Sequence, residues 1–136
     1  MFKPINYDKG RVLTLLLGNA ETITKFQLVK YSSGYIVDAA AGDSEVEYIA
    51  LETVTDGTAS DGGTTVDCLP ICSGIKVEAL TVTTPTQADD VGNSYDLAGA
   101  NTLDLTATDD NVFHIDKLKN ANDKLVIGSF NKPAII

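Results

Sequence analysis

The fold is decided by residues 44–80, which read SEVEYIALETVTDGTASDGGTTVDCLPICSGIKVEAL. β-Branched and apolar residues alternate here with acidic ones, and no helical period competes with this alternation. The pattern predicts a sheet with one buried face and one wet, negatively charged face. We expect three strands, at residues 44–55, 64–71 and 75–80, separated by a Gly-rich loop and a tight corner. In the first strand, acidic and apolar residues share a face, which predicts a bulge or bend near Tyr48–Ile49, or a strand that passes from a wet region into a covered one.

The rest of the chain continues in the same way. Strands are expected every 8–14 residues with turn signals between them, which is typical of an antiparallel barrel or sandwich. Residues 11–17 are apolar on both faces, so this strand should be central or covered. Only residues 86–92 predict a helix, with Thr86 as its N-cap and Gly92 as its C-cap.

The length of 136 residues indicates one domain. We therefore predict an all-β fold, either a small antiparallel β-barrel or a β-sandwich, with one short helix. Its body spans residues 11–130. Residues 1–10 are expected to form an extended N-terminal arm, and residues 131–136 a C-terminal tail, because neither end fits the strand pattern.

Charge is unevenly distributed along the chain. Residues 1–31 carry five bases and two acids, residues 32–110 carry one base and fifteen acids, and residues 111–136 carry four bases and two acids. The acidic middle would repel phosphates, so no nucleic-acid partner is expected. It is either a solvated face or the outward side of a molecule whose basic ends meet a negative partner.

Membrane association is not expected from the sequence. No apolar run approaches the roughly 20 residues that a membrane helix needs. The first residues also lack the apolar core of a signal peptide. We expect a soluble protein made in a cytosol-like compartment.

Few residues suggest catalysis or metal binding. His114 and Asp116 share one face of an expected strand, with a serine conceivably nearby, but the sequence supplies no nucleophile elbow. The acidic turns match no EF-hand loop, so solvated turns are favoured over a cation site. These turns contain Asp89, Asp90, Asp104, Asp109, Asp110 and Asn111. We expect no cofactor, no metal and no enzymatic activity.

Cys68 and Cys72 are four residues apart. Along one strand they would lie roughly 13 Å from each other, too far for a disulfide, which only a chain reversal near Pro70 would permit. We interpret both as buried, reduced, structural thiols. Five tyrosines could line a sugar-binding face, although the chain has no tryptophan. This leaves a carbohydrate-binding module as one alternative.

The two ends are the candidate binding elements, because each combines apolar residues with a net positive charge. Docking of both ends on a larger partner is weighed against simple fraying. The candidate contact residues are Phe2, Lys3, Ile5, Tyr7, Lys9, Arg11, Lys132, Ile135 and Ile136.

Five stretches together give the chain a resemblance to a known group of proteins. They are KYSSGYIV (30–37), EYIALET (47–53), VDCLPI (66–71), VGNSYDL (91–97) and KLVIGSF (124–130). With the polar N-terminal arm, their order resembles that of the small β-rich capsid decoration (cement) and related head proteins of tailed bacteriophages. The likeness is one of pattern and length and covers most of the chain.

The resemblance implies a small β-barrel or sandwich that binds the outside of an assembled shell, often as a trimer, with a terminal arm laid on the capsid subunits. The expected partners are the major capsid protein and other copies of the chain. The expected location is the capsid surface of a virion assembled in the host cytoplasm. The alternatives are a phage tail-tube or head–tail joining subunit, which would form a ring, and the carbohydrate-binding module.

Overall fold

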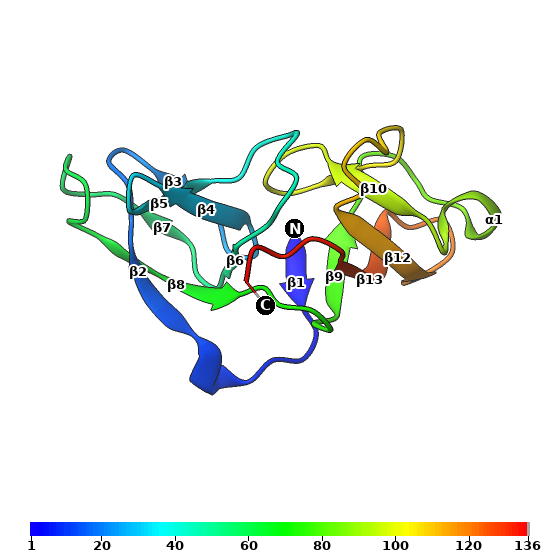
Figure 1. Cartoon of the computed structure of the whole chain (residues 1–136), viewed down its shortest axis with the longest axis horizontal. Helices are drawn as coiled ribbons and strands as arrows, with labels where there is room; N and C mark the ends of the chain where they lie inside the picture. Colours follow the sequence, from blue (N-terminus) through cyan, green and yellow to red (C-terminus); the bar gives the residue numbers. More distant parts are fainter. Residues whose placement is uncertain (136) are drawn as a thin grey trace.

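The computed structural model describes residues 1–135 and is almost entirely β. Two antiparallel sheets lie side by side along the long axis of the molecule (Figure 1). The prediction of an all-β fold with a single short α-helix is confirmed. That helix, α1 (Gln87–Asp90), begins at Thr86, whose Oγ accepts the Asp89 N–H at 3.2 Å, as the N-cap prediction requires.

The larger sheet has six strands. Their order is β1 (Phe2–Pro4), β9 (Val77–Leu80), β13 (Leu125–Phe130), β12 (Phe113–Leu118), β10 (Ser94–Leu97) and β11 (Leu103–Asp104). Buried and more accessible residues alternate strictly along β13, so this sheet has one face on the core and one toward solvent. Gly128 lies opposite Ile115 where β13 pairs with β12, and a Cβ there would overlap the His114 carbonyl oxygen.

The second sheet has five strands and curls into a half-barrel. Its order is β2 (Leu13–Leu16), β8 (Thr65–Pro70), β6 (Tyr48–Ala50), β4 (Leu28–Ser32) and β5 (Tyr35–Asp38). Its two outer strands meet through a parallel bridge between Leu17 and Ile36, and the Gly18 N–H donates to the Ile36 oxygen at 2.9 Å. A Cβ on Gly18 would lie 3.2 Å from that oxygen, so this close approach favours glycine.

A short two-stranded ribbon and one 3₁₀ turn complete the fold. The ribbon consists of β3 (Thr22–Ile23) and β7 (Val54–Thr55), and the turn is η1 (Lys9–Arg11). None of the helices within residues 1–135 is long and apolar enough to cross a membrane.

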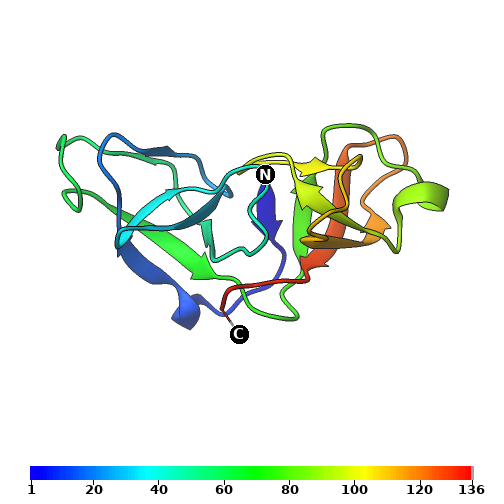
Figure 2. The same ribbon diagram turned by 45° about the horizontal axis from the view of Figure 1, so that its top comes forward.

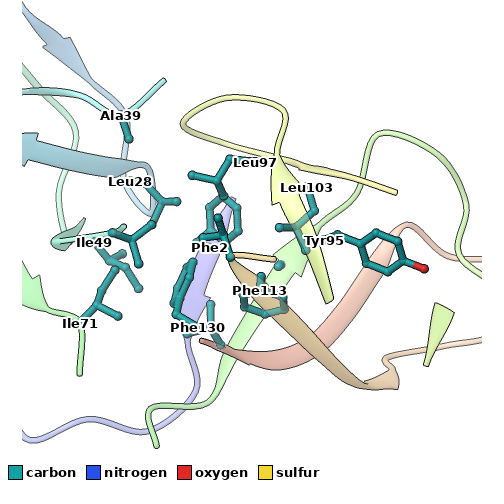
Figure 3. Packing of buried hydrophobic residues seen from close by; sticks show 14 of the residues in the cluster. Phe2, Leu28, Ala39, Ile49, Ile71, Tyr95, Leu97, Leu103, Phe113 and Phe130 are labelled. Atoms are coloured by element: carbon teal, nitrogen blue, oxygen red, sulfur yellow. The ribbon is translucent and has the colours of Figure 1, made fainter. Parts of the chain in front are cut away.

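The main hydrophobic core fills the space between the two sheets. Phe2, Phe113 and Phe130 come from the six-stranded sheet and stack with ring centroids 5.0–6.2 Å apart. Leu28 and Ile49 of the half-barrel, together with Ile71 just beyond β8, face them (Figure 3). Because one core joins both sheets, they stabilise each other. A second cluster, with Leu17, Ile23, Val29 and Ile36 among its members, lies in the half-barrel.

The stretch 44–80 forms four strands rather than the three expected. Two expectations are confirmed, since residues 64–71 give β8 and residues 75–80 give β9. The long strand at residues 44–55 is wrong as one element, because the chain bends after Ala50, just beyond the bend expected near Tyr48–Ile49. β6 stays in the half-barrel, and β7 leaves it to pair with β3. The Glu52 carboxylate holds the bend by accepting the Asp67 N–H at 2.8 Å.

The expected free arm at residues 1–10 is wrong for its first part. Residues Phe2–Pro4 pair with β9, and Phe2 is completely buried against two other phenylalanines. Burial of this large aromatic side chain stabilises the folded state, whereas a free arm would leave the ring in water. Phe2 therefore belongs to the main core, and Figure 2 shows β1 as the blue strand between the half-barrel and the rest of the six-stranded sheet.

The C-terminal tail also differs from the expectation. The Ala134 N–H donates to the Val46 oxygen at 2.8 Å, and Pro133 forms a parallel bridge with Val46. Ile135 packs against the second cluster, in the half-barrel, because this contact removes part of its apolar side chain from water. The tail thus crosses from the six-stranded sheet to the half-barrel within the same molecule (Figures 1 and 2).

A fourth difference concerns residues 11–17, which were expected to be central or covered. β2 lies at the edge of the half-barrel sheet, and only Leu17 beyond it is fully buried. Leu15 packs against the second cluster, whereas Leu13 and Leu16 stay exposed, so the strand is covered only in part.

Candidate interaction surface

Exposed apolar side chains gather in one part of the described chain. Six large hydrophobic residues are exposed in it, and four of them lie between residues 5 and 16. These four are Ile5, Tyr7, Leu13 and Leu16, with exposed fractions of 43%, 39%, 43% and 47%. We call residues 5–16 the N-terminal surface segment. Because exposed apolar area can mark an interaction site, these residues are the first candidates for one in the described chain.

The N-terminal surface segment is held in place at both ends. The Ile5 N–H donates to the Lys76 oxygen at 2.9 Å, which continues the pairing of β1 with β9. Asp8 accepts the Gly10 N–H at 2.8 Å and caps η1, and β2 then pairs along β8. The segment is therefore fixed on the body by Phe2 on one side and by β2 on the other.

Basic side chains accompany these apolar residues. Lys3, Lys9 and Arg11 are all exposed. One Arg11 guanidinium nitrogen lies 2.8 Å from the Cys72 sulfur, so this side chain is held against the corner between β8 and β9. Residues 3–11 thus carry three bases and one acid, Asp8, in a chain whose net charge is −9, and this local excess of positive charge favours a negatively charged partner.

The predicted contact residues divide into three groups. Lys3, Ile5, Tyr7, Lys9 and Arg11 are exposed and close together in the chain, as a contact surface requires. The prediction for Phe2 is wrong, because its side chain is inaccessible.

The third group comes from the tail. Lys132 is exposed, whereas Ile135 is partly buried on its own molecule, and Ile136 lies outside the described residues. Sequence reasoning missed Leu13 and Leu16, because an apolar strand was assumed to be covered.

His114 has a serine neighbour, as the sequence allowed. The Ser94 Oγ lies 3.1 Å from the His114 Nδ1, and Asp116 lies at the bulge between Ile115 and Lys117 in β12. The Asp116 carboxylate is 3.9 Å from the His114 Nε2 and forms an ion pair with Lys76. That separation is too long for the hydrogen bond that orients a catalytic histidine. The group is a polar network on the sheet surface.

The acidic turns use their carboxylates to hold loops. Asp96 is buried and accepts the N–H groups of Asp109, Asp110 and Asn111 at 2.7–3.0 Å. Hydrogen bonds from the Thr106 hydroxyl and N–H lower the pKa of Asp104. Across residues 1–135, no three His, Cys, Asp or Glu side chains are arranged to hold a metal ion.

The two thiols have different surroundings. Cys68 is buried in the half-barrel, and burial raises its pKa to about 12, which keeps it protonated and unreactive. Cys72 is half-exposed, so the expectation that both thiols are buried is wrong for this residue. Its position at the corner after β8 gives the side chain access to solvent.

A shallow cavity of about 240 Å³ lies where the C-terminal tail meets the half-barrel. Its lining residues are mostly charged or polar, namely Lys30, Tyr31, Asp43, Ser44, Glu45, Glu47 and Ala134. Lys30 pairs with Asp43 at 3.0 Å, and Glu47 accepts the Tyr31 N–H at 2.6 Å. Tyr31 is the one tyrosine among these lining residues, so this cavity is not the tyrosine-lined face expected of a carbohydrate-binding module.

Among these features, the N-terminal surface segment is the strongest candidate for function, because four of its large apolar side chains are exposed. Comparisons with protein-family models, with curated proteins and with solved structures give no match to this chain.

Proposed function

We propose that this chain is a non-enzymatic virion structural protein that binds and stabilises the outside of a phage capsid, as a decoration or cement protein. The observation that supports the proposal is the N-terminal surface segment, where four of the six exposed large hydrophobic residues gather beside three basic ones. Apolar area flanked by positive charge suits a stable contact with a larger, negatively charged surface.

The contact is made by the first half of the segment. Ile5 and Tyr7 supply the apolar area, and Lys3 and Lys9 supply the positive charge at its border. Because Phe2 is buried in the core, these residues are already ordered before binding. Less conformational entropy is lost on attachment than a flexible arm would lose.

Stabilisation of the shell follows from mass action. A protein that binds the assembled shell, and not its dissociated subunits, stabilises the shell by its binding free energy. The acidic residues of the middle of the chain then face solvent or neighbouring copies, which limits non-specific attachment to nucleic acid.

The experiment is addition of the purified protein to undecorated phage shells, followed by sedimentation and a heat challenge. The wild-type protein should co-sediment and raise the temperature at which the shells break. The test variant is Ile5→Ser with Tyr7→Ser. The matched control is Val82→Ser, which removes an equally exposed apolar side chain, 48% accessible, from another part of the molecule.

We expect the double variant to lose binding while the control retains it. Lack of binding by the wild-type protein would overturn the proposed function. Equal binding by the double variant and the control would overturn the assignment of the contact surface.

A further inference from the structure

The solvent face of the six-stranded sheet continues the N-terminal surface segment. Cross-strand partners lie on the same side of a sheet, and successive side chains alternate between its two sides. Lys3 is exposed and lies opposite Glu78 of β9, and the Ile5 N–H continues this pairing by donating to the Lys76 oxygen. Because Lys3 and Ile5 are two residues apart, both lie on the outer face. These two candidate contact residues therefore border a larger surface.

The register of the strands places one row of side chains across this face. Glu78 lies opposite Lys3 of β1 on one side and opposite Ile127 of β13 on the other. Ile127 in turn lies opposite Lys117 of β12. The row thus crosses four strands and has a lysine at each end. In Figure 1, the strands β1, β9, β13 and β12 follow one another from the middle of the molecule to the right.

Apolar side chains lie at the centre of the same face. Leu125 and Ile127 are two residues apart on β13, and Leu80 lies opposite Leu125 on β9. All three side chains are partly exposed, whereas the residues between them point into the core. Protein interfaces commonly have such an apolar centre within a polar or charged rim.

Two ion pairs cross this face. Lys119 binds Glu78 at 3.0 Å, and Lys76 binds Asp116. In both pairs one residue belongs to the β9 side and the other to the β12 side, with β13 between them. Because neighbouring strands are about 4.8 Å apart, each pair bridges roughly 10 Å of sheet above β13. The two acidic side chains of this face are therefore already neutralised.

The remaining charge on this face is positive. Within residues 1–135, Lys3 and Lys117 are exposed and take part in no ion pair. Along β1, β9, β13 and β12, with Lys76 and Lys119 directly beside them, the outward charges are four lysines and two acids. This part of the surface is positive in a chain whose net charge is −9, so it suits a negatively charged partner.

We propose that the outer face of β1, β9, β13 and β12 is the main contact surface with the shell, and that the N-terminal surface segment forms its border. This inference rests on the proposed function and specifies which side of the molecule attaches. Lys3 and Lys117 meet acidic groups of the shell, and the apolar side chains between them supply buried area.

The position of the half-barrel agrees with this orientation. It packs on the opposite face of the six-stranded sheet, through the main core. Eight of the nineteen acidic residues lie between Asp38 and Asp67, which belong to the half-barrel and its loops. With the outer sheet face on the shell, these carboxylates lie on the far side of the molecule, where their repulsion of a negative surface is screened most.

Charge reversal on the two sheets tests the proposed side. Lys117→Glu changes one end of the lysine row, and Lys25→Glu is the matched control, an exposed lysine between β3 and β4. Both variants change the net charge equally, and far-UV circular dichroism checks that both fold. In co-sedimentation with undecorated shells, Lys117→Glu should weaken binding by at least about tenfold and Lys25→Glu by less than about twofold.

Lysine acetylation locates the contact in the wild-type protein. With shells present, Lys3 and Lys117 should react with an acetylating reagent several-fold more slowly, and Lys25 at an unchanged rate, as measured by mass spectrometry. Equal binding by the two variants, or equal acetylation of Lys117 with and without bound shells, would overturn the proposed face while leaving the proposed function in place. Absence of binding by the wild-type protein would overturn both.

Discussion

Replacing Phe2 by alanine tests whether the start of the chain belongs to the core. Phe2 is completely buried, with ring centroids 6.2 Å from Phe113 and 5.6 Å from Phe130. Its N–H also donates to the Phe26 oxygen at 2.8 Å and thereby ties β1 to the half-barrel. Through its ring and its N–H, Phe2 therefore contributes to the contact between the two sheets.

Removal of a buried phenylalanine ring costs about 3–5 kcal/mol, because transfer free energy is lost and a cavity remains. With a urea slope near 2 kcal/mol/M, a loss of ~4 kcal/mol lowers the unfolding midpoint by ~2 M. Phe2→Leu should lose much less, since it keeps most of the apolar volume.

Urea unfolding followed by far-UV circular dichroism measures this loss. Ile5→Ala is the matched control, because Ile5 is only three residues away and is 43% exposed. Its unfolding free energy should change by no more than about 0.5 kcal/mol. A Phe2→Ala loss below about 1 kcal/mol, or one equal to that of the control, would refute the placement of β1 in the core.

Three further predictions concern the loops, the buried thiol and the tail. Asp96→Ala should cost about 2 kcal/mol in unfolding free energy, because three N–H groups lose their acceptor. Asp96→Asn should cost less, since the amide oxygen can still accept. Equal losses for the two variants in urea unfolding would contradict this. Burial raises the pKa of Cys68 from 9.0 to about 12, so the folded state holds this proton more tightly and stability should fall as pH rises from about 9 toward 12. Cys68→Ala should show a shallower decline in a pH series of unfolding midpoints, and an identical decline would count against this cause. Removal of residues 132–136 should leave a folded body about 2 kcal/mol less stable. Two backbone hydrogen bonds with Val46 and the packing of Ile135 are lost in this variant. An unchanged thermal midpoint would show that the tail does not dock on the half-barrel.

The fold class could be predicted because alternation in the sequence reports local backbone geometry. β8 and β9 appeared close to their predicted positions, and so did the helix after Thr86. In each case, a period of two or a capping residue carries the information within a few residues.

The placement of both chain ends could not be predicted, because it depends on contacts distant in sequence. Phe2 meets Phe113 and Phe130, and residues 133–134 meet Val46. Nothing near Phe2 indicates that aromatic partners lie more than a hundred residues away. An isolated apolar residue in an irregular segment was therefore interpreted as part of an arm.

The candidate surface was partly predictable for the same reason. The basic and apolar composition of residues 3–11 identified half of it. Leu13 and Leu16 were missed, because the sequence shows that a strand is apolar on both faces and does not show whether the sheet places it at an edge. The order of strands in a sheet is a property of the whole chain.

The most direct test of the proposed function is the binding of this protein to undecorated shells, measured by co-sedimentation across a concentration series. We predict saturable binding by the wild-type protein and by Val82→Ser, with little or none by the Ile5→Ser and Tyr7→Ser double variant. Absence of wild-type binding at every concentration would contradict a role on the capsid surface.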